Sequence, residues 1–157
     1  MLESLLARLK CILDNIAPSE EERAQREALT LQRACCSLLM EVARIAPTGI
    51  VQKRSAVASA MREEFPVSEA ALSEMMARVA RAESRLTSYY EPVKVINQRW
   101  EPGRKSRLVE RLWRVAIADG EIDAYEDQLV RKLADLMYVG HADFILARRR
   151  VEGAGSR

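Results

Sequence analysis

Apolar residues recur at every third or fourth position along most of this chain, which is the spacing of amphipathic α-helices. The first segment carries seven of them on one helical face: Leu2, Leu5, Leu6, Leu9, Ile12, Leu13 and Ile16. The pattern stops before Pro18, so an amphipathic helix is predicted within residues 1–18. Its apolar face is expected to pack on the main body of the chain, with a membrane surface or a partner as the alternatives.

Proline, glycine and capping residues divide the next part of the chain into helices. Ser19 precedes three glutamates, which favours the start of a second helix because acids are stabilised at the positive end of its dipole. Pro47-Thr48-Gly49 ends this helix, and a third is predicted from about Ile50. Ser68 then caps a fourth helix after the break at Pro66.

The second half continues the alternation of helices and turns. Residues 86–100 are less periodic, and Glu101-Pro102-Gly103 separates them from a basic helix that leads to Gly120. A glycine is favoured there because the end of a helix often needs a positive φ. Two last helices are predicted, at about residues 123–138 and 141–151.

An internal repeat groups these helices into two units. The segment 39–43 matches the segment 112–116 in its apolar pattern. Four downstream apolar residues then fall opposite four others: Met61, Phe65, Val67 and Leu72 opposite Leu133, Met137, Val139 and Phe144. The interpretation is two pseudo-repeats, at about 31–85 and 104–152, that pack around a pseudo-two-fold axis and share one core.

The predicted fold is all-α, because the alternating patterns typical of strands are missing and aromatic residues make up only 5% of the chain. We expect a bundle of about seven to eight helices. The predicted organisation is an N-terminal helix at 1–18, a helical domain at 19–152 and a frayed tail at 153–157. A chain of 157 residues with 48% hydrophobic content can bury a core without disulfides.

The cysteines and the lengths of the apolar stretches indicate where in the cell the protein is expected. Cys11, Cys35 and Cys36 are an odd set within helical patterns, which indicates reduced, packed thiols. Zinc binding by these cysteines and His141 is not predicted, since no familiar ligand spacing is present. No stretch of about 18 apolar residues exists. The expected location is the cytoplasm, with membrane association as an option.

The sharpest chemical hypothesis concerns the residues around Gly120. Five carboxylates cluster there: Asp119, Glu121, Asp123, Glu126 and Asp127. Asp123 and Glu126 have the spacing of a capping box. Asp119 is harder to explain, because an acid in the last turn of a helix costs about 0.3–1 kcal/mol. Asp119, Glu121, Asp123 and Glu126 therefore form a candidate weak site for Ca²⁺ or Mg²⁺, although not with EF-hand spacing. The alternative is a solvated loop that pairs with a nearby Arg or Lys.

Basic residues form a second pattern. Arg104, Arg107, Arg111 and Arg114 recur at helical spacing and could make one stripe. Such a stripe could meet an acidic partner, phosphate groups or anionic lipid, or it could be a solvated face with Glu110 and its neighbours. Specific nucleic-acid binding is not predicted, because no recognisable reading element is present.

Enzyme chemistry has little support in the sequence. His141 is the only histidine, and it follows Gly140 at the predicted start of the last helix. A role at the helix start is therefore preferred to a role in a catalytic triad. The chain has no glycine-rich phosphate loop. We expect no catalytic residues and no certain cofactor.

The stretch 108–144, which runs through the acidic loop, resembles the second repeat of the tellurite-resistance TerB-like family. The resemblance covers about 31–150 and is weaker in the first half, where residues 46–49 replace a second acidic loop. It implies an all-helical fold of two pseudo-repeated units in a bacterial protein associated with tellurite and chemical stress. It also implies calcium binding through the acidic loop, here Asp119, Glu121, Asp123 and Glu126.

Two functions follow as hypotheses. The first is a non-enzymatic, stress-associated interaction module with a divalent-cation site in the acidic loop. The alternative is a helical adaptor that binds a protein or an anionic membrane through its basic stripe, with no metal role. The sequence leaves the partner and the oligomeric state open.

Overall fold

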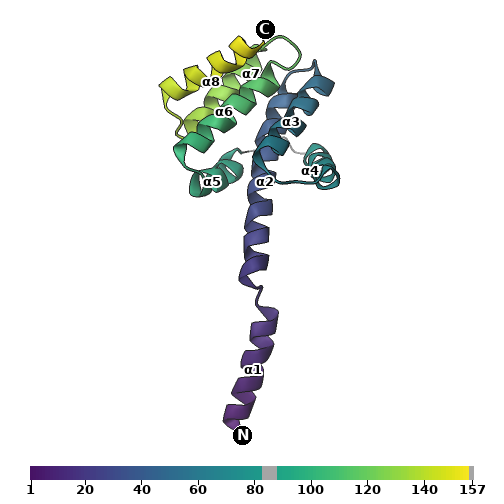
Figure 1. Ribbon diagram of the computed structural model, residues 1–157, viewed down its shortest axis with the longest axis vertical. Coiled ribbons are helices and arrows are strands. Elements are labelled where there is room, and N and C mark those ends of the chain that lie inside the picture. Colours follow the sequence, from purple (N-terminus) through teal and green to yellow (C-terminus); the bar gives the residue numbers. More distant parts are fainter. Residues whose placement is uncertain (83–87, 156–157) are drawn as a thin grey trace. The chain divides into compact units, whose positions relative to one another are not determined.

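The computed structural model describes residues 1–82 and 88–155, and all regular structure in them is helical (Figure 1). The all-α prediction is confirmed. Eight helices are described: α1 (Leu2–Ile16), α2 (Glu20–Ile45), α3 (Ile50–Glu64), α4 (Glu69–Arg81), α5 (Tyr90–Arg99), α6 (Pro102–Ala116), α7 (Ala124–Leu136) and α8 (His141–Ala154).

The predicted helix starts are confirmed by their capping bonds. The Ser19 hydroxyl accepts from the Glu22 amide at 3.2 Å, and the Glu22 carboxylate accepts from the Ser19 amide at 3.0 Å. The Ser68 hydroxyl accepts from the Ala71 amide at 3.2 Å. Gly49 precedes α3 with a φ of 70°, a conformation that glycine adopts without steric cost.

Helix ends and the less periodic stretch differ from the prediction. Residues 90–99 form α5, because Val93, Ile96 and Trp100 are buried at helical spacing. α8 continues to Ala154, three residues beyond its predicted end. Residues 83–85 of the first predicted repeat, Leu86 and residues 156–157 of the predicted tail lie outside the described residues.

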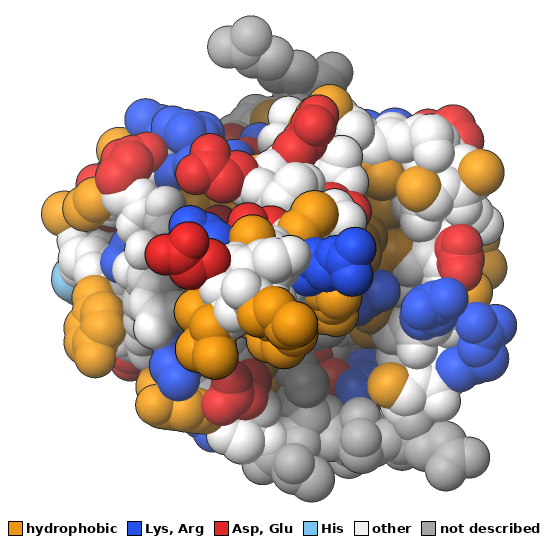
Figure 2. Space-filling model, turned by 90° about the horizontal axis from the view of Figure 1, so that it is seen from below, with side chains coloured by type: hydrophobic (Ala, Val, Ile, Leu, Met, Phe, Trp, Pro, Cys, Tyr) orange, Lys and Arg blue, Asp and Glu red, His pale blue; other side chains and the backbone are white. Residues whose placement is uncertain are grey.

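The chain divides into two compact units, Met1–Thr30 and Leu31–Arg157. α2 begins in the first unit and continues into the second. Within the first unit, α1 has no buried residue, so this unit by itself leaves the apolar face of α1 uncovered. Figure 2, viewed from below Figure 1, shows hydrophobic side chains at the surface with acidic and basic side chains beside them. Among the described residues, no helix has the length and apolarity that crossing a membrane requires.

In the second unit, α6 packs against α3, α7 and α8 and carries the centre of the core (Figure 1). Trp113 of α6 is fully buried and lies 5.5 Å from Phe144 of α8 between ring centroids. Three pairs that the sequence placed opposite each other are buried in both halves: Met61 and Leu133, Phe65 and Met137, Leu72 and Phe144. The pseudo-two-fold axis itself stays a prediction.

The cysteines are only partly as expected. All three are free thiols, and Cys35 and Cys36 are buried in α2. Burial raises the pKa of Cys36 to about 12 and that of Cys35 further, so both stay protonated near neutral pH. Cys11 is exposed on α1, and the prediction that it is packed was wrong.

Candidate functional site

The acidic loop joins α6 to α7, and its conformation is set by local hydrogen bonds. Gly120 turns the chain with a φ of 97°. The Asp123 carboxylate accepts from the Tyr125 amide at 2.7 Å, and the Glu126 carboxylate accepts from the Asp123 amide at 3.1 Å. The predicted capping box at the start of α7 is therefore confirmed.

A lysine from the first half of the chain enters this loop. Lys53 of α3 is fully buried, and its Nζ donates to the Thr48 carbonyl at 2.9 Å and to Glu126 Oε1. The same Nζ lies 3.5 Å from Asp119 Oδ2. Glu126 is also fully buried, so this is an ion pair between two interior charges. The three donors of the ammonium thus face three oxygens.

The structure brings only part of the predicted metal site together. Asp119 and Glu126 face the Lys53 ammonium, whereas Asp123 faces the α7 amides and Glu121 is exposed. Among the described residues, no three His, Cys, Asp or Glu side chains converge as metal ligands would. This arrangement does not fit a divalent cation, because an ammonium already lies between the two converging carboxylates.

Asp119 lies close to residues that precede and begin α3, in the first half of the second unit. Burial raises the pKa of Asp119, but the Glu121 amide, the Lys53 charge and the Thr48 hydroxyl together lower it below its usual range. A Cβ added at Gly49 would lie 2.4 Å from the Asp119 Cβ, so only glycine fits there. The loop that precedes α3 therefore packs directly against the acidic loop at Gly49 and Asp119.

The basic stripe of α6 lies against α3. Arg111 is buried, and its guanidinium lies 2.7 Å from Glu64, which also receives Arg104 at 2.6 Å. Arg114 pairs with Glu63 at 2.9 Å. The hydrogen bond from Arg114 lowers the pKa of Glu63 against the opposing effect of burial. Most of the predicted stripe is thus engaged in ion pairs that join α3 to α6.

A further ion-pair cluster ties α7 to α8. Asp127 receives Arg131 at 2.8 Å and Arg148 at 2.6 Å. The Arg148 guanidinium also lies 4.8 Å from the Trp113 ring centroid. Burial raises the pKa of Asp127, but the two arginines outweigh it and hold the pKa below its usual range.

These lowered pKa values predict acid destabilisation. For Glu63, Asp119 and Asp127 the folded-state pKa is below the unfolded one. Their stabilising effect is complete above the unfolded pKa of about 4 and is lost as the pH falls through the folded values. Urea unfolding of Asp127→Asn should therefore show a shallower decline below about pH 4 than the wild type. Equal declines would contradict a role for Asp127.

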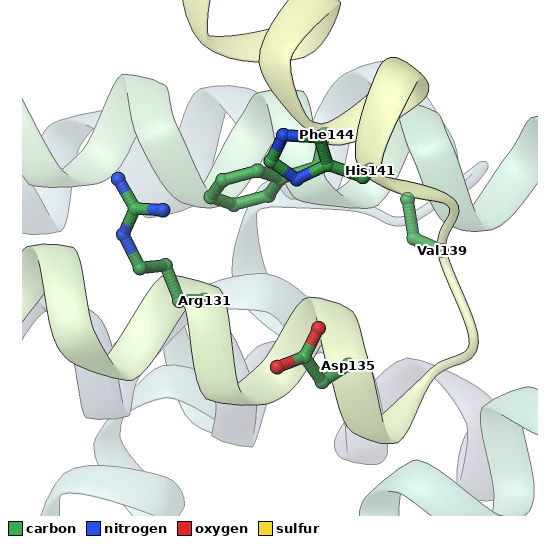
Figure 3. Close-up of a pocket in the computed structure, with 5 residues that line it drawn as sticks. All are labelled: Arg131, Asp135, Val139, His141 and Phe144. Atoms are coloured by element: carbon green, nitrogen blue, oxygen red, sulfur yellow. The ribbon is translucent and has the colours of Figure 1, made fainter.

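A small cavity of about 190 Å³ is lined in part by the single histidine, His141 (Figure 3). His141 and Phe144 of α8 stack at 6.4 Å, and Arg131 and Asp135 of α7 lie across from them. Val139 completes the described lining, and none of these five residues carries a hydroxyl or a thiol. His141 is the first residue of α8, as predicted. Its side chain is exposed.

A larger groove of about 580 Å³ lies where the start of α5 meets the end of α7. We call it the tyrosine groove. Its lining residues are Ser88, Tyr89, Tyr90, Val93, Lys94, Asn97, Gln98, Lys132, Leu136 and Tyr138. Among the described lining residues, the charged side chains are two lysines. Lys132 Nζ lies 5.1 Å from the Tyr89 ring centroid, and Lys94 Nζ lies 5.6 Å from that of Tyr90. This volume is in the range of ligand-binding sites.

Tyr138 stands out within the tyrosine groove. Its φ is 58°, and it is the non-glycine residue with positive φ among those described. The Val139 amide donates to the Ala134 carbonyl at 3.0 Å, and the Tyr138 amide donates to Asp135 at 3.0 Å, which is the Schellman pattern. Glycine usually occupies this position, because a side chain there costs roughly 1–2 kcal/mol. The Tyr138 side chain is 81% exposed, so burial does not offset that cost.

Sequence reasoning missed both Lys53 and the tyrosine groove. Lys53 shares a helical face with Val57 and Met61, so a lysine on an apolar face was the available signal. Three of the four tyrosines line the groove, but Tyr138 is far from the other two in sequence. Nothing in the apolar pattern indicates that they meet.

The structure is that of a small helical protein. In its second unit, α6 lies at the centre of the core, and the carboxylates of the acidic loop pair with the Lys53 ammonium. The family profile described as "Tellurite resistance protein TerB" matches residues 32–149, which is most of the chain. The chain therefore belongs to the TerB tellurite-resistance family, and the resemblance over 31–150 is confirmed. Searches of curated proteins and of solved structures gave no match to this chain.

Proposed function

We propose that this TerB-family chain is a non-enzymatic interaction module that binds an acidic, amphipathic peptide segment of a partner protein. The binding site is the tyrosine groove. The observation that carries the proposal is the combination of tyrosine and aliphatic walls with Lys94 and Lys132. Helical peptides commonly bind their partners by placing apolar side chains in such a groove.

Charge complementarity identifies the class of peptide. Lys94 and Lys132 are exposed, and none of the described residues that line the tyrosine groove is a carboxylate. A peptide with acidic residues beside its apolar ones would pair with both lysines, whereas a basic peptide would be repelled. The tyrosines would supply large contact areas with few rotatable bonds.

The strained backbone at Tyr138 adds independent support. Residues in rarely populated conformations cluster at functional sites, where the strain is retained for a purpose. A glycine would relieve the strain without losing a buried contact, since the Tyr138 side chain is exposed. The Tyr138 ring has one charged neighbour in the described chain, Lys105, whose Nζ lies 5.9 Å from the ring centroid. The rest of the exposed ring is available to contact a partner.

The acidic loop has a structural role in this proposal. The Lys53 ammonium supplies the positive charge that Asp119 and Glu126 require, so no divalent cation is invoked. The basic stripe is not assigned to a partner, because Glu63 and Glu64 already pair with it. We place the module in a reducing compartment such as the cytoplasm, in line with its free cysteines.

Tyr138→Gly separates the two effects of this residue. The variant should be about 1 kcal/mol more stable than the wild type, because it removes a strained αL side chain. It should also bind the partner peptide at least about tenfold more weakly, which corresponds to about 1.4 kcal/mol. Urea unfolding and fluorescence anisotropy measure the two quantities. Unchanged peptide affinity would contradict the proposed site.

A peptide-display selection on the full chain identifies the ligand class. Peptides recovered on the wild type should combine aromatic or aliphatic residues with Asp or Glu, and should not bind Lys94→Glu, Lys132→Glu. A matched control, Lys10→Glu, Arg54→Glu, changes the charge equally outside the groove and should bind them normally. No enrichment, or equal binding to the groove variant, would refute the proposal.

A further inference from the structure

Lys105 of α6 is a buried lysine with no acidic partner among the described residues. It is 8% exposed, and its Nζ donates to Asn97 Oδ1 at 3.3 Å and lies 5.9 Å from the Tyr138 ring centroid. Neither contact brings a negative charge. Lys53, the other buried lysine of the described chain, instead pairs with two carboxylates of the acidic loop. Lys105 therefore differs from Lys53 in lacking a counter-ion within the described chain.

The Lys105 ammonium has donors left for an anion. Burying a charge is costly unless it is paired and hydrogen-bonded, so a buried lysine usually has an acidic partner. An ammonium carries three N–H donors, and one of them goes to Asn97. Within the described chain, no other acceptor is hydrogen-bonded to this Nζ. A carboxylate has two oxygens, so it would take both remaining donors and supply the missing charge.

This ammonium borders the tyrosine groove. Asn97 and Tyr138, the two residues that the Lys105 Nζ contacts, both line the groove. Asn97 Nδ2 donates to the Leu136 carbonyl at 3.0 Å, which holds the Asn97 Oδ1 toward Lys105. Tyr138 is 81% exposed, so its ring can turn aside without breaking buried contacts. Rotation of that ring would open the ammonium to a ligand in the groove.

We propose that Lys105 binds one carboxylate of the partner peptide and so determines which acidic peptides bind. The inference rests on the proposed function, because the peptide delivers this carboxylate to the tyrosine groove. Lys94 and Lys132 are exposed, so salt screens their attraction, which favours acidic peptides in general. Lys105 is buried and bonded to Asn97, so it selects a carboxylate at one point of the peptide. That carboxylate belongs to an Asp or Glu side chain or to the peptide C-terminus.

Urea unfolding tests whether the Lys105 charge is unpaired in the free protein. Lys105→Met removes the ammonium and keeps an unbranched side chain. Because the lost charge has no acidic partner among the described residues, the urea midpoint should equal or exceed that of the wild type. Lys53→Met breaks a buried ion pair and should have a clearly lower midpoint. A midpoint for Lys105→Met as low as that of Lys53→Met would show that Lys105 already has a partner within the chain, which would overturn the inference.

Fluorescence anisotropy on the full chain tests the binding step, with a peptide recovered from the display selection as the probe. Each acidic residue of the peptide is replaced in turn by Asn or Gln, and a separate peptide has an amidated C-terminus. One of these changes should weaken binding to the wild type at least about tenfold, and binding to Lys105→Met less than about twofold. Lys94→Met is the matched control, and on this variant the same change should weaken binding as much as on the wild type.

The outcomes separate this inference from the proposed function. A peptide that needs Lys94 and Lys132 but binds Lys105→Met as tightly as the wild type overturns the inference and leaves the proposed function intact. If every change weakens binding to the wild type and to Lys105→Met equally, the carboxylates bind elsewhere and the inference is also wrong. If no peptide binds in the tyrosine groove, the proposed function and this inference both fail.

Discussion

Lys53→Met should lower the free energy of unfolding by about 3–5 kcal/mol, since removing one partner of a buried ion pair leaves the other charge uncompensated. Lys53 and Glu126 are both fully buried, and Met fills a similar volume without the ammonium. The Thr48 carbonyl and Asp119 would lose the same donor. Urea unfolding monitored by circular dichroism measures the difference.

A double variant separates the charge from the packing. Lys53→Met, Glu126→Gln removes both interior charges, and the Gln oxygen can still accept from the Asp123 amide. It should recover a large part of the loss. Lys10→Met, which replaces an exposed lysine, should change stability by less than about 0.5 kcal/mol. A loss at Lys53 no larger than that at Lys10 would show that the ion pair is not structural.

Gly49→Ala should be the second most damaging of the changes considered, at roughly 2–4 kcal/mol. The positive φ alone costs an alanine about 1–2 kcal/mol. The added Cβ would also lie 2.4 Å from the Asp119 Cβ, and the acidic loop would have to move. Displacing Asp119 would weaken its contact with Lys53 as well.

Gly120→Ala is the matched control for the backbone term. Gly120 also has a positive φ, but a Cβ there would meet no atom within 4 Å. It should therefore cost only the conformational term, and Gly49→Ala should exceed it in the same urea titration. Equal decreases in the free energy of unfolding at the two positions would mean that the steric clash with Asp119 does not contribute to the effect of Gly49→Ala.

Local and periodic features of the fold could be predicted from the sequence. The capping residues Ser19, Ser68 and Asp123 act within one turn of the residues that they bond, so their effects can be read from spacing. The apolar periodicity likewise identified α1 and the buried faces of α2 and α6. Residues 90–99 were harder, because a ten-residue helix offers few repeats of its pattern.

The candidate sites depend on contacts between distant residues, which spacing does not reveal. Lys53 and Glu126 are separated by 73 positions, and the acidic loop was interpreted without its lysine. The stripe that includes Arg111 was predicted as one exposed face, but Glu63 and Glu64 of α3 lie against it. The partner of each charge is set by tertiary packing.

The Lys53 ammonium changes what the acidic loop can do. A divalent cation would need the oxygens of Asp119 and Glu126, and both face this ammonium. The ammonium cannot exchange with solvent ions because it is tethered to α3. The loop would then hold α3 against the start of α7 at all cation concentrations. The partner peptide would bind in the tyrosine groove.

Calorimetric titration of the metal-free chain with Ca²⁺ and Mg²⁺ shows whether the Lys53 ammonium takes the place of a divalent cation in the acidic loop. We expect no saturable heat and no shift in the thermal midpoint, because the Lys53 charge already neutralises the carboxylates of Asp119 and Glu126. Saturable binding in roughly the 10⁻⁵ to 10⁻³ M range, abolished in Asp119→Asn, Glu126→Gln, would contradict it. That result would show that a cation displaces the lysine and would restore a metal-dependent role.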